Sequence, residues 1–438
     1  DHVRALQGLA DVVLVVLGYF FVPWGSQPRE KAASSQGYSG SATSTGNISR
    51  DWAAGIGTAW TLDSISPVRG EHDEVTTLVD GTTLYVAATN TTREGLDVTA
   101  VDISGSQPQV IWDSSNPNVI RDSYRLNLRM ASVGDKLIVG NSTVDKATGE
   151  VQEAPWVDDA PLTVAGDVLV TCSGAETCTG WTWESSEWKQ QWKSITSLQE
   201  LRHGIWEMRD APVVGSGDDM SVLAPVADRR TLQLINVRTG TVTTLGEKVQ
   251  LDPTSYRRDV FVASDGVAVV VDRDQAQFFD TSGTLVDSFQ VARYLNEIVR
   301  GGQAPTLEEL RTYLTTRRTP WVAGTVEVSG RKCEDVTVST TSGGSSHIVH
   351  DAKGLAIGSG ESCYPDVTEV RMSADGAAVY IVNGGHVQSD HVYFLDTEGD
   401  VIHEDMALTS ADQLTWAFDD LVIAISKGQI TAFTPASA

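Results

Sequence analysis

The chain beyond residue 50 alternates short apolar runs with turns rich in Gly, Asp and Ser. Residues 75–88 read VTTLVDGTTLYVAA, for example, and residues 260–272 read VFVASDGVAVVVD. Val, Ile, Leu, Tyr and Thr alternate in these short runs, and Asp-Gly, Gly-Asp or Ser-Gly turns separate the runs, which is typical of consecutive antiparallel hairpins. The pattern therefore predicts an all-β domain over residues 51–438.

A longer unit recurs within this pattern. Two apolar strands joined by a Gly/Asp turn lead to a third strand that ends in an apolar residue and Asp or Asn. A Thr/Ser-Gly turn and a fourth strand, often ending in Trp, complete the unit. The acidic or amide position recurs about every 40–50 residues where the units are regular, at Asp102, Asp145, Asn236, Asp280 and Asp396. Four strands at this period indicate a β-propeller of about eight blades, with seven as the alternative count.

The last unit indicates how the ring closes. It ends after its third strand, at Phe433, and lacks an outer strand ending in Trp. Residues 59–62, AWTL, stand before the first complete unit and can supply that strand. Such a closure removes the open sheet edges that a linear array would expose.

These units resemble the pyrroloquinoline-quinone-like propellers, which include quinoprotein dehydrogenases and the propeller lipoprotein of bacterial outer-membrane assembly. The resemblance rests on Asp-x-x-Thr/Ser-Gly patterns ending in Trp and covers about residues 52–433. It implies that a Trp docks between neighbouring blades, and the candidates are Trp60, Trp112, Trp156 and Trp192. The dehydrogenases are expected to carry two adjacent cysteines at their cofactor. No two cysteines are adjacent here, so we expect no cofactor and no catalytic residues.

One insertion interrupts the repeat at residues 291–318. Apolar residues have helical spacing there, and Thr306 followed by Glu309 has the spacing of a capping box. The sequence predicts two short helices joined by Gly301 and Gly302. They are either a decoration packed on the propeller or a contact site for a partner, since inserts on a repeat scaffold often carry function.

The amino end differs from the rest of the chain. Residues 5–24, ALQGLADVVLVVLGYFFVPW, are long and apolar enough to cross a bilayer as a helix. We predict a signal-anchor helix within residues 1–31 and a flexible Ser/Gly/Thr linker at residues 32–50. Asp11 lies inside the apolar stretch, where a carboxylate either reaches the headgroups or contacts a polar group of a membrane partner.

The four cysteines indicate a compartment. Cys172 and Cys178 bracket a short polar loop, and Cys333 and Cys363 flank a Gly/Ser-rich region, so two disulfides are expected. Disulfides persist in oxidising compartments. The predicted location is therefore the cell membrane, with a single span, a cytoplasmic amino end and an extracytoplasmic propeller.

The net charge and the motifs limit which ligands and cofactors the protein is expected to bind. The net charge of −26 argues against nucleic-acid binding, which needs clustered Lys and Arg. Arg far exceeds Lys, which indicates a high-GC, actinobacterial source. His347 and His350 are weak metal candidates, and the aspartates at 158, 159, 272 and 274 show no calcium-loop spacing, so calcium remains a minor alternative to no cofactor.

A tryptophan cluster surrounds the loop between Cys172 and Cys178, comprising Trp181, Trp183, Trp188 and Trp192. Blade packing explains it most simply, whereas exposure would indicate a binding patch. The leading functional prediction is a non-catalytic scaffold or accessory subunit of a bacterial cell-envelope complex, with an integral membrane protein as partner. The alternative is a propeller that binds or modifies an envelope glycan or small molecule at its central channel.

Overall fold

The computed structural model describes most of the chain from residue 48 onward. The described ranges are 48–69, 74–90, 95–116, 130–156, 159–173, 177–195, 213–225, 232–246, 260–271, 275–291, 305–316, 320, 324–329, 335–340, 346–350, 356–357, 364–365, 367–383, 392–395, 401–404, 413–426 and 428–436. All structural statements below refer to these residues. The predicted anchor, linker residues 32–47 and Asp11 lie outside them.

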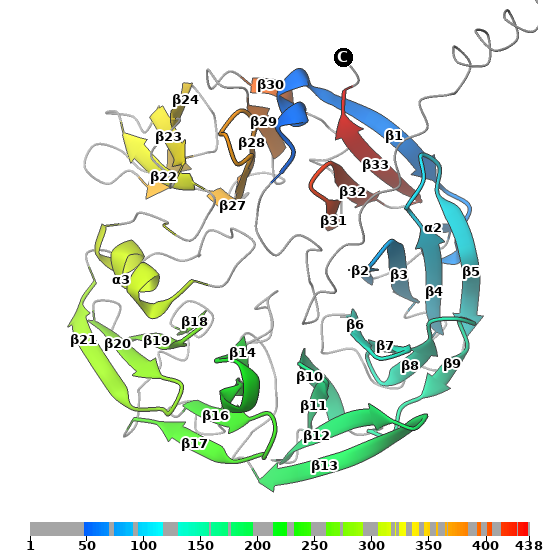
Figure 1. Cartoon of the computed structure of the whole chain (residues 1–438), viewed down its shortest axis with the longest axis vertical. Coiled ribbons are helices and arrows are strands. Elements are labelled where there is room, and N and C mark those ends of the chain that lie inside the picture. The colour runs from blue at the N-terminus through cyan, green and yellow to red at the C-terminus, as the bar shows by residue number, and fades with distance from the viewer. Residues whose placement is uncertain are drawn as a thin grey trace, which may run out of the picture.

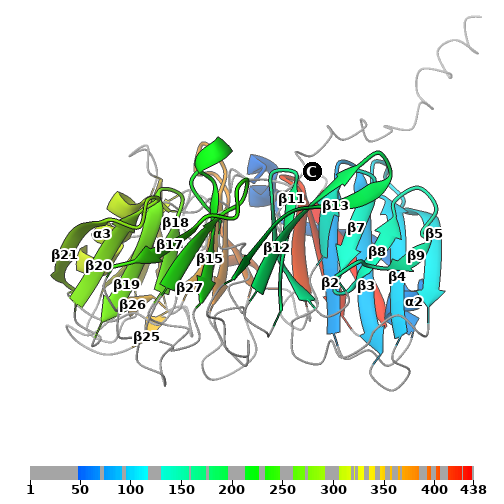
Figure 2. The same cartoon turned by 90° about the horizontal axis from the view of Figure 1, so that it is seen from below.

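The described residues form a ring of antiparallel sheets around a central axis, a β-propeller of eight blades (Figure 1). Each blade is a meander, and Figure 2 shows the ring as a disc seen from the side. Blade 1 comprises β2 (Glu74–Asp80), β3 (Thr83–Asn90), β4 (Gly95–Asp102) and β5 (Gln109–Asn116), and blade 2 comprises β6 (Met130–Val133), β7 (Lys136–Val139), β8 (Ser142–Asp145) and β9 (Val151–Glu153). Blade 3 comprises β10 (Asp159–Ala165), β11 (Val168–Ser173), β12 (Thr177–Glu184) and β13 (Glu187–Ile195). Blade 4 comprises β14 (Val213–Val214), β15 (Ser221–Pro225), β16 (Leu232–Asn236) and β17 (Val242–Leu245).

The second half of the ring repeats the plan with one irregular blade. Blade 5 comprises β18 (Val260–Ala263), β19 (Gly266–Val271), β20 (Gln275–Asp280) and β21 (Leu285–Gln290), and blade 6 comprises β22 (Gly324–Ser329), β23 (Asp335–Thr340) and β24 (Ser346–His350). Blade 7 comprises β27 (Val367–Met372), β28 (Val379–Asn383), β29 (Val392–Leu395) and β30 (Val401–Glu404). Blade 8 comprises β31 (Gln413–Phe418), β32 (Leu421–Ser426), β33 (Gln429–Pro435) and β1 (Ile56–Leu62). Blade 6 has three strands, and the short pair β25 (Ala356–Ile357) and β26 (Tyr364–Pro365) lies beside it.

Blade 8 joins the two ends of the domain, as the sequence predicts. β1 pairs with β33 in antiparallel register, with Trp60 opposite Ala432 and Leu62 opposite Ile430. The strand that stands first in the sequence is thus the outer strand of the last blade. The prediction of an all-β propeller of about eight blades is confirmed.

The hydrophobic core is divided among the blade interfaces. On β3, Leu84 and Val86 pack toward blade 8, whereas Tyr85 and Ala87 pack toward blade 2. The alternation of a strand sends successive side chains to opposite faces, and both faces of a blade are covered by neighbours. All four side chains are therefore buried, at no more than 5% exposure.

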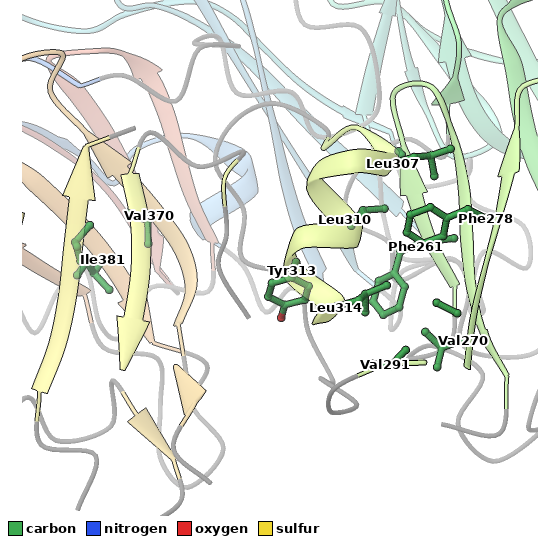
Figure 3. Packing of buried hydrophobic residues seen from close by; sticks show 14 of the residues in the cluster. Phe261, Val270, Phe278, Val291, Leu307, Leu310, Tyr313, Leu314, Val370 and Ile381 are labelled. Atoms are coloured by element: carbon green, nitrogen blue, oxygen red, sulfur yellow. The ribbon is translucent and has the colours of Figure 1, made fainter. Parts of the chain in front are cut away.

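The helical insertion is part of this core. Helix α3 (Leu307–Thr316) lies between blade 5 and the sheets of blades 6 and 7, and Leu310 and Leu314 lie beside Phe261 (Figure 3). Thr306 and Glu309 form the predicted capping box, with the Glu309 backbone N–H donating to Thr306 Oγ1 at 3.2 Å. The helix is thus a wedge in the ring rather than a surface decoration. The first predicted helix lies outside the described residues.

A short segment before β1 secures the closure. The 3-10 helix η1 (Arg50–Ala54) buries Trp52 completely between blades 7 and 8, stacked on Phe394 with ring centroids 4.7 Å apart. Its indole N–H donates to the backbone carbonyl oxygen of Asp419 at 2.9 Å. Helix α2 (Ser66–Arg69) and the 3-10 helix η2 (Gly217–Asp219) complete the helical elements described.

The predicted single-pass membrane location needs correction. Crossing a bilayer takes about 20 consecutive apolar helical residues. No helix in the described parts of the chain has both the length and the apolar character that this requires, and α3, with 10 residues, is the longest of them. The prediction that the protein is a single-pass protein of the cell membrane is contradicted by this finding.

Candidate binding surface

Two of the four predicted docking tryptophans reach from one blade to the next with their indole N–H. Trp112 on β5 donates to the backbone carbonyl oxygen of Lys146 in blade 2, at 2.8 Å. Trp192 on β13 donates to the carbonyl oxygen of Val237 in blade 4, at 2.7 Å. In both cases the acceptor lies in the turn after the third strand of the following blade, which is where the repeated Asp/Asn-x-x-Thr-Gly pattern occurs.

The side chains of that pattern explain why it recurs. Asp145 Oδ1 accepts hydrogen bonds from the backbone N–H groups of Ala147 and Thr148, both at 3.0 Å. Such a local acceptor fixes a tight turn. Gly149 then has a φ of +73°, and a Cβ there would lie 2.6 Å from the Trp112 ring. The glycine therefore allows both the turn and the close approach of the indole.

The other two predicted docking residues are buried differently. Trp60 packs with Ile103 at the interface of blades 8 and 1, and Trp156 packs among aromatic residues of blade 3. Neither indole N–H has a hydrogen-bond partner within the described residues.

Four tryptophans gather at the interface of blades 2 and 3, and we refer to Trp156, Trp181, Trp183 and Trp188 as the indole cluster. The ring centroid of Trp156 lies 4.9 Å from that of Trp188 and 5.7 Å from that of Trp181. Trp183 and Trp188 are 5.1 Å apart. Trp156 is 2% exposed, whereas the other three are only partly buried.

The unequal strand lengths of blades 2 and 3 account for this cluster. The outer strand of blade 2, β9, has three residues, whereas β12 and β13 of blade 3 have eight and nine. In Figure 1 the tip of the β12–β13 hairpin extends toward blade 2. Ser185 and Ser186 form its turn with φ of 52° and 64°, which places Trp183 directly opposite Trp188. The hairpin thus leaves these two indoles at the perimeter of the ring.

A lysine and a carboxylate lie beside the cluster. Lys136 Nζ is 5.2 Å from the centroid of the Trp183 ring and 2.7 Å from Asp145 Oδ2. The hydrogen bond from Lys136 lowers the pKa of Asp145 to about 2. The lysine is largely buried, so its charge is held in place by the indole face and the carboxylate together.

A second ion pair links this region to blade 1. Lys146 Nζ lies 2.6 Å from Asp80 Oδ2 and also hydrogen-bonds to the Ser132 hydroxyl. Burial, together with the Asp80 charge, raises the pKa of Tyr85 to about 12. An ion pair therefore joins blades 1 and 2, and the contact of Lys136 with the Trp183 ring joins blade 2 to blade 3.

The inner strands place polar side chains near the axis, but these bond to one another. Thr77 on β2 and Thr415 on β31 have hydroxyl oxygens 2.5 Å apart, and Gln413 donates to Thr77 Oγ1 at 2.9 Å. Arg371 on β27 pairs with Glu369. The Thr77 contacts join blades 1 and 8, whereas the Arg371–Glu369 pair lies within β27 of blade 7. These contacts assemble no convergent set of acids or bases.

Few of the metal-site candidates fall on described side chains. Asp159 Oδ2 accepts a hydrogen bond from the Thr171 hydroxyl at 3.2 Å. Within the ranges given above, no group of three or more His, Cys, Asp and Glu is placed to hold a metal ion. The side chains of His347 and His350 are not among those described, nor are Asp158, Asp272 and Asp274.

The structure joins one of the two predicted cysteine pairs. Cys172 on β11 and Cys178 on β12 are directly opposite in register and form a disulfide with Cα atoms 4.1 Å apart. Cys333 and Cys363 lie outside the described residues.

Sequence reasoning missed two contributors to this region and to the ring. Lys136 is part of no recognisable motif. Its role depends on contacts with Asp145, on the third strand of its own blade, and with Trp183 of the next blade. Trp52 had a signal, since an isolated Trp just before the closing strand suggests an anchor, but its pocket is built from residues more than 300 positions away.

Comparisons with known proteins add little to this geometry. No family model matches the chain, and a search of curated proteins finds no significant match. Solved structures similar to it include BamB from Moraxella catarrhalis, with 15% identity, 86% of this chain and 99% of that chain covered, and a TM-score of 0.37. The WD40 domain of SCAP from fission yeast has 10% identity, coverage of 87% and 98%, and a TM-score of 0.41. Sqt1 from Chaetomium thermophilum has 11% identity, coverage of 87% and 98%, and a TM-score of 0.40. At these values the similarity carries no inference about function.

Proposed function

We propose that this propeller is a non-catalytic scaffold or accessory subunit that binds a protein partner in a bacterial cell-envelope complex. The observation that carries the scaffold proposal is the indole cluster, whose Trp183 and Trp188 remain partly exposed at the perimeter of a closed ring. Tryptophan is one of the residues enriched among the few that contribute most of the binding energy at protein interfaces. The envelope setting rests on the sequence-based resemblance alone.

The closed ring supports the same proposal. β1 pairs with β33 in blade 8, and Trp52 packs between blades 7 and 8, so both ends of the domain are fixed in the ring. The binding surface is therefore rigid, and binding a partner costs little conformational free energy for ordering that surface. Thr77, Thr415 and Gln413 on the inner strands bond to one another, and Arg371 pairs with Glu369, so these polar groups give no support to the alternative of a channel ligand.

The test is purification of the full chain from its native cells, followed by mass measurement and identification of any stoichiometric partner. A photo-crosslinking amino acid at Gln190, which is exposed on β13 opposite Trp181, reports contact at the indole cluster. Gln290 is the matched control, because it is exposed on β21, the outer strand of blade 5. We expect one stoichiometric partner, crosslinked from position 190 and not from 290. A monomer with no crosslinked product from either position would overturn the proposal. The prediction that this partner is an integral membrane protein is tested by its identity.

A further inference from the structure

We infer that residues 48–55, which we call the strap, form a pH-sensitive closure that is held to the ring more tightly in mild acid than at neutral pH. The strap comprises Ile48, Ser49, the 3-10 helix η1 and Gly55, and it lies where the described chain enters the ring between blades 7 and 8. This inference goes beyond the proposed scaffold function and does not depend on any partner.

The strap is held from two sides by hydrogen bonds to the two blades. The backbone N–H of Ile48 donates to the carbonyl oxygen of Met372, the last residue of β27, at 3.2 Å. On the side of blade 8, the carbonyl oxygen of Asp419 accepts from the Ser49 N–H at 2.8 Å and from the Trp52 indole N–H at 2.9 Å. One turn of blade 8, between β31 and β32, therefore receives two of the donors of the strap.

The strap can open while the ring stays closed. β1 follows it directly and is paired with β33 from Ile56 to Leu62, in a ladder that does not include the strap. The strap itself has one short 3-10 helix and two buried hydrophobic side chains, Ile48 and Trp52. Short segments with few hydrogen bonds open at a lower free-energy cost than paired strands in a core. Opening of the strap therefore leaves the pairing of β1 with β33 in place.

Carboxylates of like charge meet where the strap contacts blade 8. Asp51 lies in the strap between the two donors, and Asp419 and Asp420 form the turn that accepts from them. Asp51 and Asp419 are exposed, and neither forms an ion pair among the described residues. Partial desolvation of the Asp419 carboxyl, together with the charges of Asp420 and Asp51, raises its pKa above the ordinary value. Closing the strap is therefore opposed by the ionised form of Asp419.

The direction of the pH effect follows from the raised pKa. Asp420 stays in the same turn when the strap opens, whereas Asp51 leaves with the strap and the Asp419 carboxyl regains water. The pKa of Asp419 then returns toward the ordinary value of about 3.9. Between that value and the raised one, the closed strap binds more protons than the open strap. Closure is thus favoured as the pH falls toward about 4 and is weakened as the pH rises through the raised pKa.

Two ion pairs of described residues supply further charges around the strap. Arg50 Nη1 lies 3.5 Å from Asp375 Oδ2, on the turn between β27 and β28. The hydrogen bond from the Ser373 hydroxyl lowers the pKa of Asp375, so this carboxyl stays ionised above about pH 4. Arg371 pairs with Glu369 within β27. The repulsion between the strap and the turn of blade 8 is therefore the contribution that mild acid removes.

The experiment measures hydrogen exchange of the full chain by mass spectrometry from pH 4 to pH 7, with each rate divided by the intrinsic rate at that pH. The readout is the protection of a peptide that covers residues 48–55. Asp419→Asn is the key variant, because it removes the charge and keeps the backbone carbonyl that accepts from the strap. Asp51→Asn removes the opposing charge from the strap itself. Asp63→Asn is the matched control, because Asp63 is exposed just beyond Leu62, at the end of β1 away from the strap.

We expect the strap peptide of the wild type to be about two- to fivefold better protected at pH 4 than at pH 7. Asp419→Asn and Asp51→Asn should each raise protection at pH 7 and reduce this difference, whereas Asp63→Asn should leave it unchanged. A peptide from β3 reports the whole domain and should stay better protected than the strap throughout. Equal strap protection at pH 4 and pH 7, equal effects of Asp419→Asn and Asp63→Asn, or strap protection as high as that of β3 would overturn the inference.

Discussion

The indole N–H of Trp112 donates a hydrogen bond to the backbone carbonyl oxygen of Lys146, 2.8 Å away in the next blade. The ring of Trp112 also lies where a Cβ of Gly149 would be, so the turn and the indole occupy one shared space. Docking of blade 1 on blade 2 therefore depends on the absence of a side chain at residue 149.

Gly149→Ala tests this contact. A Cβ at 2.6 Å from the ring forces Trp112 to move, and overpacking of this kind costs about 1–3 kcal/mol. Gly140→Ala is the control, because Gly140 also has a positive φ, +57°, but a Cβ at that residue would meet nothing within 4 Å. The free energy of unfolding from urea denaturation should fall more for residue 149 than for residue 140. Equal losses would show that the backbone conformation alone matters.

Trp52→Ala tests the segment before the closing strand. Trp52 is fully buried and stacked on Phe394, so its removal is expected to lower the free energy of unfolding by about 3–5 kcal/mol. Trp52→Phe keeps a ring beside Phe394 and loses the hydrogen bond to the Asp419 carbonyl, so it should cost less. Chemical denaturation measures both. Unchanged stability in the alanine variant would contradict the proposed anchoring of the ring closure.

Leu310→Ala distinguishes a wedge from a decoration. Leu310 is fully buried in the cluster shared by α3 and blades 5, 6 and 7, and a large-to-small change there costs about 2–5 kcal/mol. Unfolding of the whole domain should therefore shift to lower temperature. The exposed neighbour Glu308, changed to Gln, is the control. If only local helix content fell and the main transition stayed in place, α3 would be a decoration.

The disulfide gives a further stability test. Closing a loop this short is worth about 2 kcal/mol in the chain-entropy model. The double change of Cys172 and Cys178 to Ser should lower the unfolding free energy by about that amount. Peptide mass under non-reducing conditions checks the bond directly, since the peptide with both residues should resist alkylation. Free thiols at both positions would show that the bond does not form.

The lowered pKa of Asp145 predicts that the stability of the domain depends on pH. Its hydrogen bond from Lys136 lowers its pKa to about 2 in the folded protein, whereas an aspartate in the unfolded chain has a pKa of about 3.9. A lowered folded pKa means that the contribution to stability is complete above about pH 4 and is lost as the pH falls toward 2. The difference in unfolding free energy between the wild type and Asp145→Asn should therefore shrink below pH 4. A difference that is constant from pH 3 to 7 would contradict this assignment.

The sequence predicted the repeats because local rules dictate them. Short, almost continuous apolar runs make strands that are buried on both faces, and the Asp145 and Gly149 positions specify a turn by contacts within a few residues. The closing strand could also be predicted from the sequence. The last repeat unit lacks a fourth strand, and a strand near residue 60 belongs to no complete unit, and these two do pair in the structure.

The sequence alone determined that this protein is a closed propeller with a strongly acidic surface. Only the tertiary structure decided what the interfaces contain. It placed α3 as a wedge beside Phe261, Trp52 between blades 7 and 8, and Lys136 against Trp183, because each of these contacts joins residues of different blades or distant segments. Strands and turns are specified by residues close together in the sequence, whereas a binding surface depends on which side chains the ring brings together and leaves partly exposed.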